Sequence, residues 1–379
     1  IFEGFSYISA GFIIAGYYVG YLSGSILIPI LLQRVGHIRV FAALASLASI
    51  AILLHSVFID PYSWFLIRIL TGISIAGIYI IMESWLSDKS TNTTRGKLLS
   101  IYMIVTFSFV GLGQLLLNVS DPAKVDLFIL ISILLSFALL PILLSNTEAP
   151  DFANPKQLGF KKLYIISPLG FVAAFFIGMT HSIIFGFGAV YAAAKNFEIF
   201  QISIFMLIIT IFGAVLQWPI GFLSDRIDRR VILVGTTLLA SGACIFIVIS
   251  SYLSLTIFFI VLALYSGMSL PLYSLAIAHI NEFLQPDEIV TAVASFAILV
   301  GVGAILGPIV VSVFMSIIGA DGFFIYLFIV HILLGLFGLY RMGKRPKPPD
   351  IESQYVPLPR NITATGMELN PKTETEEKN

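Results

Sequence analysis

The chain has 379 residues, of which 58% are apolar and only 11% are charged, and its formal net charge is zero. A mean hydropathy of +0.99 excludes a water-soluble globular domain and indicates a polytopic membrane protein. The single cysteine, Cys244, excludes a disulfide framework and a cysteine-based metal site.

Apolar runs of about twenty residues recur along the chain, which is the length that an α-helix needs to cross a bilayer. They are too long and too uniformly apolar for barrel strands, so we expect helices that satisfy their backbone polar groups internally. The sequence predicts eleven spans, at 8–33, 38–57, 62–86, 98–118, 125–145, 163–194, 199–223, 231–250, 254–279, 289–317 and 322–341.

A long polar connection, SNTEAPDFANPKQLGFKK, separates the fifth span from the sixth and is rich in Pro, Asn and Lys. It predicts a linker between two helical halves. We therefore expect an N-terminal half at 1–145, a cytoplasmic linker at 146–162, a six-helix half at 163–341 and a disordered cytoplasmic tail at 342–379.

Lys and Arg are unevenly divided between two sets of alternate loops. One set includes Arg34 and Arg39 and carries further basic residues at 89–97, 156–162, 226–230 and 341–347. The other set holds only Lys124 and Lys195. By the positive-inside rule the basic set is cytoplasmic, which also places the C-terminus in the cytoplasm.

The two halves resemble each other. QRVGHIR at 33–39 is similar to DRIDRR at 225–230, and VGLG at 110–113 matches VGVG at 300–303, with about 190 residues between the copies. The charged loop follows the second span of the later half but the first span of the earlier half. We therefore expect a twelve-helix protein whose first helix is missing from this sequence.

The stretch GFLSDRIDRR at 221–230 concentrates charge in an apolar region. Its spacing resembles the signature loop of the major facilitator superfamily, at Gly221, Leu223, Asp225, Arg226, Arg229 and Arg230. The first-half copy keeps Arg34, Gly36 and Arg39 but has Gln33 where the family expects Asp. The alternative is a solvated turn that only obeys the positive-inside rule.

Four other stretches are similar to a bacterial subgroup of this superfamily with undefined substrate: RILTGISIAGIYIIMESW, TRGKLLSIYM, ISPLG and QWPIGFLSDR. The resemblance extends to about residue 341. It implies an all-α fold of two six-helix halves, in the bacterial inner membrane, that moves a small solute by alternating access, as a secondary active or facilitative transporter. Protons are a candidate coupling ion, and a transport-inactive membrane sensor is the alternative.

Few His, Asp or Glu residues lie within the spans, and no phosphate-binding, HExxH or GxSxG motif occurs. We therefore expect no enzyme activity, no cofactor and no metal. The expected partners are a small-molecule substrate and the lipid bilayer, with no nucleic acid, and the chain is expected to act as a monomer.

Two charged residues lie within the third span. Arg68 shares one helix face with Gly72 and Ala76, and the family resemblance associates an arginine there with substrate or proton coupling; the alternative is that Arg68 reaches the outer interface. Glu83 lies about 22 Å further along the helix. We expect the Glu83 carboxylate to form an ion pair in a cytoplasmic gate, with Arg34, Arg39 or Arg95. We expect Glu282 to form a second such ion pair, with Arg226, Arg229 or Arg230. Static helix-end capping is the alternative.

Polar side chains inside other spans are candidates for contact with a solute, and each could instead form a hydrogen bond between helices. They are His181, Gln114, Gln217, Tyr265, Ser269 and Tyr273. Glycines at spacing four, Gly16, Gly20 and Gly24, with Gly303 and Gly307, predict close helix packing and, by the resemblance, sliding surfaces between the halves.

Overall fold

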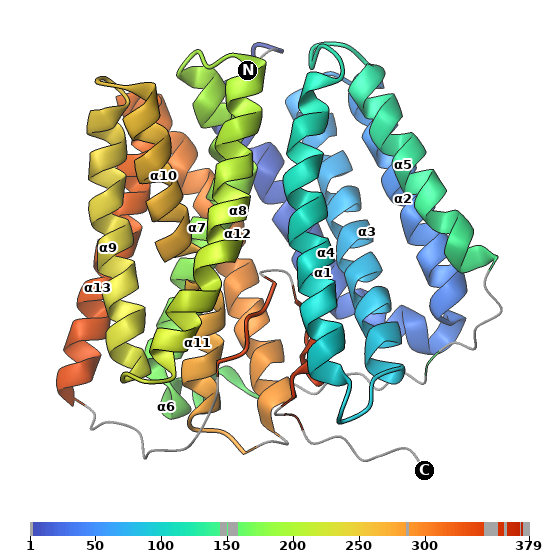
Figure 1. The fold of residues 1–379 in the computed structure, drawn as a ribbon. Helices are drawn as coiled ribbons and strands as arrows, with labels where there is room; N and C mark the ends of the chain where they lie inside the picture. The colour runs from blue at the N-terminus through green and yellow to red at the C-terminus, as the bar shows by residue number, and fades with distance from the viewer. Residues whose placement is uncertain are drawn as a thin grey trace.

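The fold is taken from a computed structural model that describes residues 3–144, 150, 158–285, 288–344, 355–359, 362–371 and 373. Within these ranges the chain is helical, and eleven helices are long and apolar enough to cross a membrane, which confirms the predicted spans. Five lie before the predicted linker and six after it (Figure 1). Most of the predicted linker, 146–162, lies outside the described residues.

The first half contains α1 (Tyr7–Val35), α2 (His37–Val57), α3 (Pro61–Asp88), α4 (Arg95–Leu115), a 3₁₀ turn (Leu116–Asn118) and α5 (Asp126–Leu143). Local sequence sets where two of these helices begin. Gly36 alone separates α1 from α2 and has a φ of 91°, a backbone conformation that favours glycine. The Asp60 carboxylate accepts hydrogen bonds from the backbone N–H groups of Tyr62 and Ser63, and Pro61 is the first residue of α3.

The second half contains α6 (Phe160–Ile166), α7 (Pro168–Ala194), α8 (Ile199–Ser224), α9 (Arg229–Ser250), α10 (Leu255–Ser269), α11 (Leu272–Asn281), α12 (Ile289–Ile318) and α13 (Gly322–Lys344). Its core is aromatic at one end. Tyr191 packs against Phe205, Phe258, Phe323 and Phe324, with ring centroids 5.0–6.4 Å apart.

Two predicted spans differ from the structure because of proline. The span predicted at 163–194 is divided into the short helix α6 and the spanning helix α7, since Pro168 begins a new helix that Ser167 caps. The span predicted at 254–279 is divided into α10 and α11 by Leu270 and Pro271, because a proline offers no N–H to the preceding helical turn.

Small residues allow pairs of helices to approach closely within each half. A Cβ added to Gly20 would lie 2.0 Å from the Ile69 carbonyl oxygen, and one added to Gly303 would lie 2.0 Å from that of Phe175. These contacts join α1 to α3 and α12 to α7. The glycine strips therefore pack each half internally, which differs from the expected sliding surfaces between the halves.

Part of the C-terminal tail also differs from its expected disorder. Residues 355–359 and 362–371 lie between the two halves at one end of the bundle, with a 3₁₀ turn at Gly366–Leu369 (Figure 1). The apolar side chains of Leu358, Ile362, Met367 and Leu369 are each at most 3% exposed. Burial against the helices supplies the hydrophobic contact that an isolated polar tail lacks. The other tail residues, 345–354, 360–361, 372 and 374–379, lie outside the described residues.

Candidate functional site

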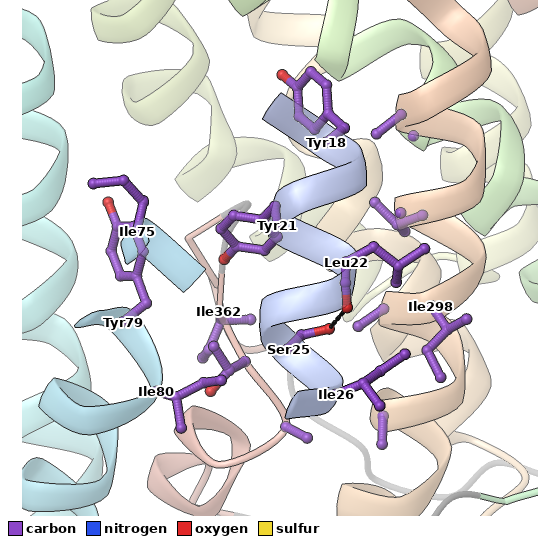
Figure 2. A pocket seen from close by; sticks show the side chains of 18 of the residues that line it. Tyr18, Tyr21, Leu22, Ser25, Ile26, Ile75, Tyr79, Ile80, Ile298 and Ile362 are labelled. Carbon is purple, nitrogen blue, oxygen red and sulfur yellow. Dashed lines mark hydrogen bonds between the residues drawn. The ribbon is translucent and has the colours of Figure 1, made fainter. Parts of the chain in front are cut away.

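A cavity of about 730 Å³ lies between the two halves. The first half contributes residues of α1 and α3, and the second half contributes residues of α7, α11 and α12 (Figure 2). We call the end of the bundle that holds the C-terminal segment the tail face, and the end where α1 begins the opposite face. The C-terminal residues Ile362, Thr363, Ala364 and Thr365 line the cavity on its tail-face side.

Tyrosines dominate the polar lining of the cavity. The ring centroids of Tyr17 and Tyr18 are 5.1 Å apart, edge to face, and that of Tyr21 is 6.1 Å from Tyr17. Tyr79 of α3 and Tyr273 of α11 complete the set, among aliphatic side chains such as Ile75, Ile80 and Ile298 (Figure 2). The lining contains no Asp, Glu, Lys or Arg among the described residues. It therefore offers hydroxyl groups and apolar surface without formal charge.

Two of the predicted site residues line the cavity. His181 of α7 and Tyr273 of α11 are both buried on its second-half side. His181 Nε2 lies 3.3 Å from the backbone carbonyl oxygen of Ser269, and Ser269 Oγ lies 3.1 Å from His331 Nε2. Ser269 therefore lies behind the lining, where it connects two buried imidazoles.

Three other predicted site residues are outside the lining. Gln114 donates a hydrogen bond to the Val110 carbonyl of its own helix, at 3.2 Å. Tyr265 packs against the rings of Phe324 and His331 in the core of the second half. Gln217 donates to Ser274 Oγ at 2.6 Å and to the Leu358 carbonyl at 3.1 Å, so its amide contacts the C-terminal segment.

Arg68 lies on α3, two turns from the lining residue Ile75 on the side of the opposite face. Its charge interacts with the hydroxyl groups of Tyr17 and Tyr18. Within the described part of the chain its buried Nε has no hydrogen-bond partner. Arg68 therefore lies near the cavity's tyrosines without lining it.

Glu83 is fully buried, and its partners differ from the expected arginines. Tyr102 Oη donates to Glu83 Oε1 at 2.8 Å, and the backbone N–H of Thr363 donates to Oε2 at 2.9 Å. The Thr363 hydroxyl also donates to Oε2. Arg95 instead donates to Thr373 in the C-terminal segment. Arg34 and Arg39 are exposed at the tail face.

The signature-like turn is part of a charge cluster that includes three predicted residues, Asp225, Arg229 and Glu282. Arg229 donates to Asp225 Oδ1 at 2.8 Å and to Glu282 Oε1 at 3.1 Å, and Glu282 is also 2.9 Å from His279 Nδ1. Arg230 instead pairs with Asp228, which caps α9. Burial alone would raise the pKa of Asp228, but the hydrogen bonds from Arg230 hold it below its usual range.

The remaining residues of this turn have different surroundings. Arg226 is exposed, and its guanidinium lies 4.0 Å from the centroid of the Phe222 ring. A Cβ added to Gly221 would lie 2.2 Å from Cδ1 of Tyr355. Gly221 therefore leaves room for the C-terminal segment as well as for the turn.

No group of three or more His, Cys, Asp or Glu side chains could hold a metal ion in the described ranges. The α1 tyrosines and the C-terminal segment were not among the residues predicted from the sequence. The sequence YYVGY at 17–21 was the available signal for the first, since it places hydroxyl groups inside an apolar span. For the C-terminal segment, the available signal was the group of apolar residues at 358, 362, 367 and 369 within the tail.

Comparison with known proteins decides the family. A family model described as Major Facilitator Superfamily matches residues 3–276 and 170–367. The chain belongs to this superfamily. An MFS-type transporter of Yersinia pestis (strain Pestoides F) is 26% identical over 354 residues, covering 91% of this chain and 88% of that protein. The MFS-type transporter YcaD of Escherichia coli O45:K1 is 24% identical over 341 residues, covering 89% and 88%.

Solved structures show the same fold for this superfamily member. A point mutant of the nucleoside transporter NupG superposes with a TM-score of 0.73 at 14% identity, covering 90% of this chain and 92% of that one. A bacterial homologue of the human lysosomal transporter Spinster, in an inward-facing and occupied conformation, also has a TM-score of 0.73, at 15% identity, covering 91% and 92%. The expected superfamily, its all-α fold and its place as an integral membrane protein are confirmed.

Proposed function

We propose that this superfamily member moves a small solute across the bacterial inner membrane by alternating access. The observation that carries the proposal is the cavity between the halves, because both halves line it and a rocking motion would expose it to either side. One chain supplies the whole lining, so a monomer is sufficient.

The contacts between the halves support an inward-facing state. At the opposite face Tyr18 Oη donates to the Ser182 carbonyl at 3.2 Å, and Asn118 donates to Ser203 Oγ at 2.8 Å. A Cβ added to Gly11 would lie 2.5 Å from Ser312 Oγ, so α1 and α12 touch there. The Lys and Arg distribution assigns the tail face to the cytoplasm.

The lining favours an uncharged, amphipathic solute. Tyrosine hydroxyls and the His181 imidazole can donate and accept hydrogen bonds, while the tyrosine rings and isoleucines offer apolar surface. A volume of about 730 Å³ is typical of pockets for small molecules. Because the described lining has no charged side chain to pair with an ionised solute, burying a charged solute there would be unfavourable.

The test begins with a thermal-shift screen of uncharged amphipathic compounds on the full chain, since a ligand of the native state raises its apparent stability. Compounds that bind are then tested for flux in proteoliposomes, with and without a pH gradient to detect proton coupling. Binding without flux in either condition would contradict the proposal and favour a sensor.

His181→Ala tests the cavity itself. Removing the imidazole should lower flux roughly tenfold, because one hydrogen bond to the solute is lost. Ser266→Ala is the matched control, since Ser266 is buried, its hydroxyl bonds only the Leu262 carbonyl among the described residues, and it does not line the cavity. Equal flux in the two variants, at equal thermal stability, would remove His181 from the site.

A further inference from the structure

The C-terminal segment, by which we mean the described residues of 355–373, contacts both halves at the tail face. On the second half, Asp225 Oδ1 accepts a hydrogen bond from the Tyr355 backbone N–H at 2.6 Å. The backbone of Leu358 is held at both of its polar groups. Its N–H donates to Ser274 Oγ at 3.1 Å, and its carbonyl accepts from Gln217 at 3.1 Å.

On the first half, the segment forms hydrogen bonds with polar and charged side chains of α3 and α4. Thr363 donates to Glu83 from both its N–H and its hydroxyl. Ser87 Oγ donates to Glu368 Oε2 at 2.6 Å, and Arg95 Nη1 donates to Thr373 Oγ1 at 3.2 Å. The segment therefore bridges α3 and α4 to α8 and α11.

Two glycines fit the segment into this site. Tyr355 packs directly on Gly221, and a Cβ added to Gly366 would lie 2.5 Å from Glu83 Oε2. Burial raises the pKa of Tyr355, so its phenol is neutral in this position. Backbone groups of the segment, Gly366 within it and Gly221 on α8 thus allow close contact between the segment and the surface that it covers.

We propose that the C-terminal segment is an intramolecular ligand of the tail face that closes the cavity and holds the transporter inactive. The inference rests on the proposed function. Ile362–Thr365 line the cavity at its tail-face end, so they lie across the route by which a solute would leave toward that face (Figure 2 shows Ile362 there). The segment also lies where the two halves would meet in an outward-facing state, so it opposes the rocking motion.

A labelling experiment tests closure without any need for transport. Ser25 lines the cavity, and Ser25→Cys preserves its size. The native Cys244 is fully buried, so an impermeant maleimide applied to the tail face should react with position 25. Adding Thr363→Glu places a second carboxylate beside Glu83 and should raise the labelling rate about tenfold or more. Ser100→Glu is the control, since Ser100 is exposed on α4 and its hydroxyl donates to the Gly96 carbonyl of its own helix.

A disulfide tests whether the docked segment stops transport. The Cβ position at Gly221 is 2.9 Å from Tyr355 Cγ, so the Cβ atoms of Gly221→Cys and Tyr355→Cys lie at most about 4.4 Å apart, within disulfide range. Oxidation of the double variant should lower flux roughly tenfold, and a reductant should restore it. Gly221→Cys alone should not respond to oxidant.

The outcomes separate this inference from the proposed function. Equal labelling in Thr363→Glu and Ser100→Glu would overturn closure by the segment, even in a chain that transports. Full flux after complete cross-linking would contradict the inhibition of transport by the docked segment. Raised labelling in Thr363→Glu with no flux in any variant would support closure of the cavity and contradict the transport function itself.

Discussion

Glycine positions set how closely the helices approach one another. In the first half Gly20 and Gly72 face each other's helices, since a Cβ on Gly72 would lie 2.0 Å from the Tyr17 carbonyl oxygen. Close contact of this kind replaces the hydrophobic effect as a source of helix association in lipid. It also fixes Tyr17 and Tyr21, and therefore one wall of the cavity, relative to α3.

Replacing Gly20 by alanine should destabilise the fold. Gly20→Ala should lower the free energy of unfolding by about 1–3 kcal/mol, because the added methyl group forces α1 away from α3. Gly242→Ala is the matched control, since nothing lies within 4 Å of a Cβ there. It should be neutral or slightly stabilising, by up to about 1 kcal/mol. Equal midpoints of thermal unfolding in detergent would contradict the close approach.

At the scale of elements, the turn between α8 and α9 connects the charge cluster to the C-terminal segment. Asp225 ends α8 and accepts hydrogen bonds from Arg229, the first residue of α9, and from Tyr355. Arg229 also donates to Glu282 and to the Ala278 carbonyl, which joins the turn to α11. A change at this turn therefore reaches the segment and α11 together.

Asp225→Asn should weaken the attachment of the segment. The asparagine amide keeps the shape of the aspartate side chain but loses its charge-assisted hydrogen bonds. This loss lowers the free-energy preference for the docked state by about 1–2 kcal/mol. That corresponds to a roughly five- to thirtyfold larger released population. The rate at which a maleimide applied to the tail face labels Ser25→Cys measures this released population. Arg226→Gln is the control, because Arg226 is exposed and contacts the Phe222 ring. If Asp225→Asn did not change the labelling rate, the turn at 221–230 would be only a solvated turn.

For the whole molecule, the loops that the sequence predicts to be cytoplasmic carry most of the Lys and Arg residues, and the other set of loops carries Lys124 and Lys195. By the positive-inside rule this distribution predicts that the tail face is cytoplasmic, because Lys and Arg near the ends of spans are retained on that side. With this predicted orientation, release of the C-terminal segment would open the cavity toward the cytoplasm.

Reporter fusions test this orientation. An enzyme reporter fused after Lys347 should report the cytoplasm, and one inserted near Asp121, in the loop before α5, should report the exterior. The end of α13 at Lys344 and the loop before α5 lie at opposite faces of the bundle (Figure 1), so the two fusions serve as controls for each other. The same compartment for both would show that the number of spans between them is wrong.

The class of protein, its spans and its family could all be predicted from the sequence alone. Hydropathy fixes a span because twenty apolar residues need no distant partner to prefer the bilayer. Asp60 with Pro61, Ser167 with Pro168, and Gly36 end or begin helices through bonds to near neighbours. The signature-like turn was recognisable for the same reason, since its residues are close in sequence.

The cavity and the place of the C-terminal segment depend on tertiary structure. Tyr21 and His181 are about 160 residues apart in sequence, and nothing local to either predicts that they line one space. Residues 355–373 are rich in Pro, Thr and Asn and contain no long apolar run, and their composition alone predicts disorder. The described ones are held in place because the bundle supplies Glu83, Gln217 and Asp225 as partners and an apolar surface for Leu358 and Met367. Such contacts form only after the two halves have assembled, so no single stretch of sequence contains them.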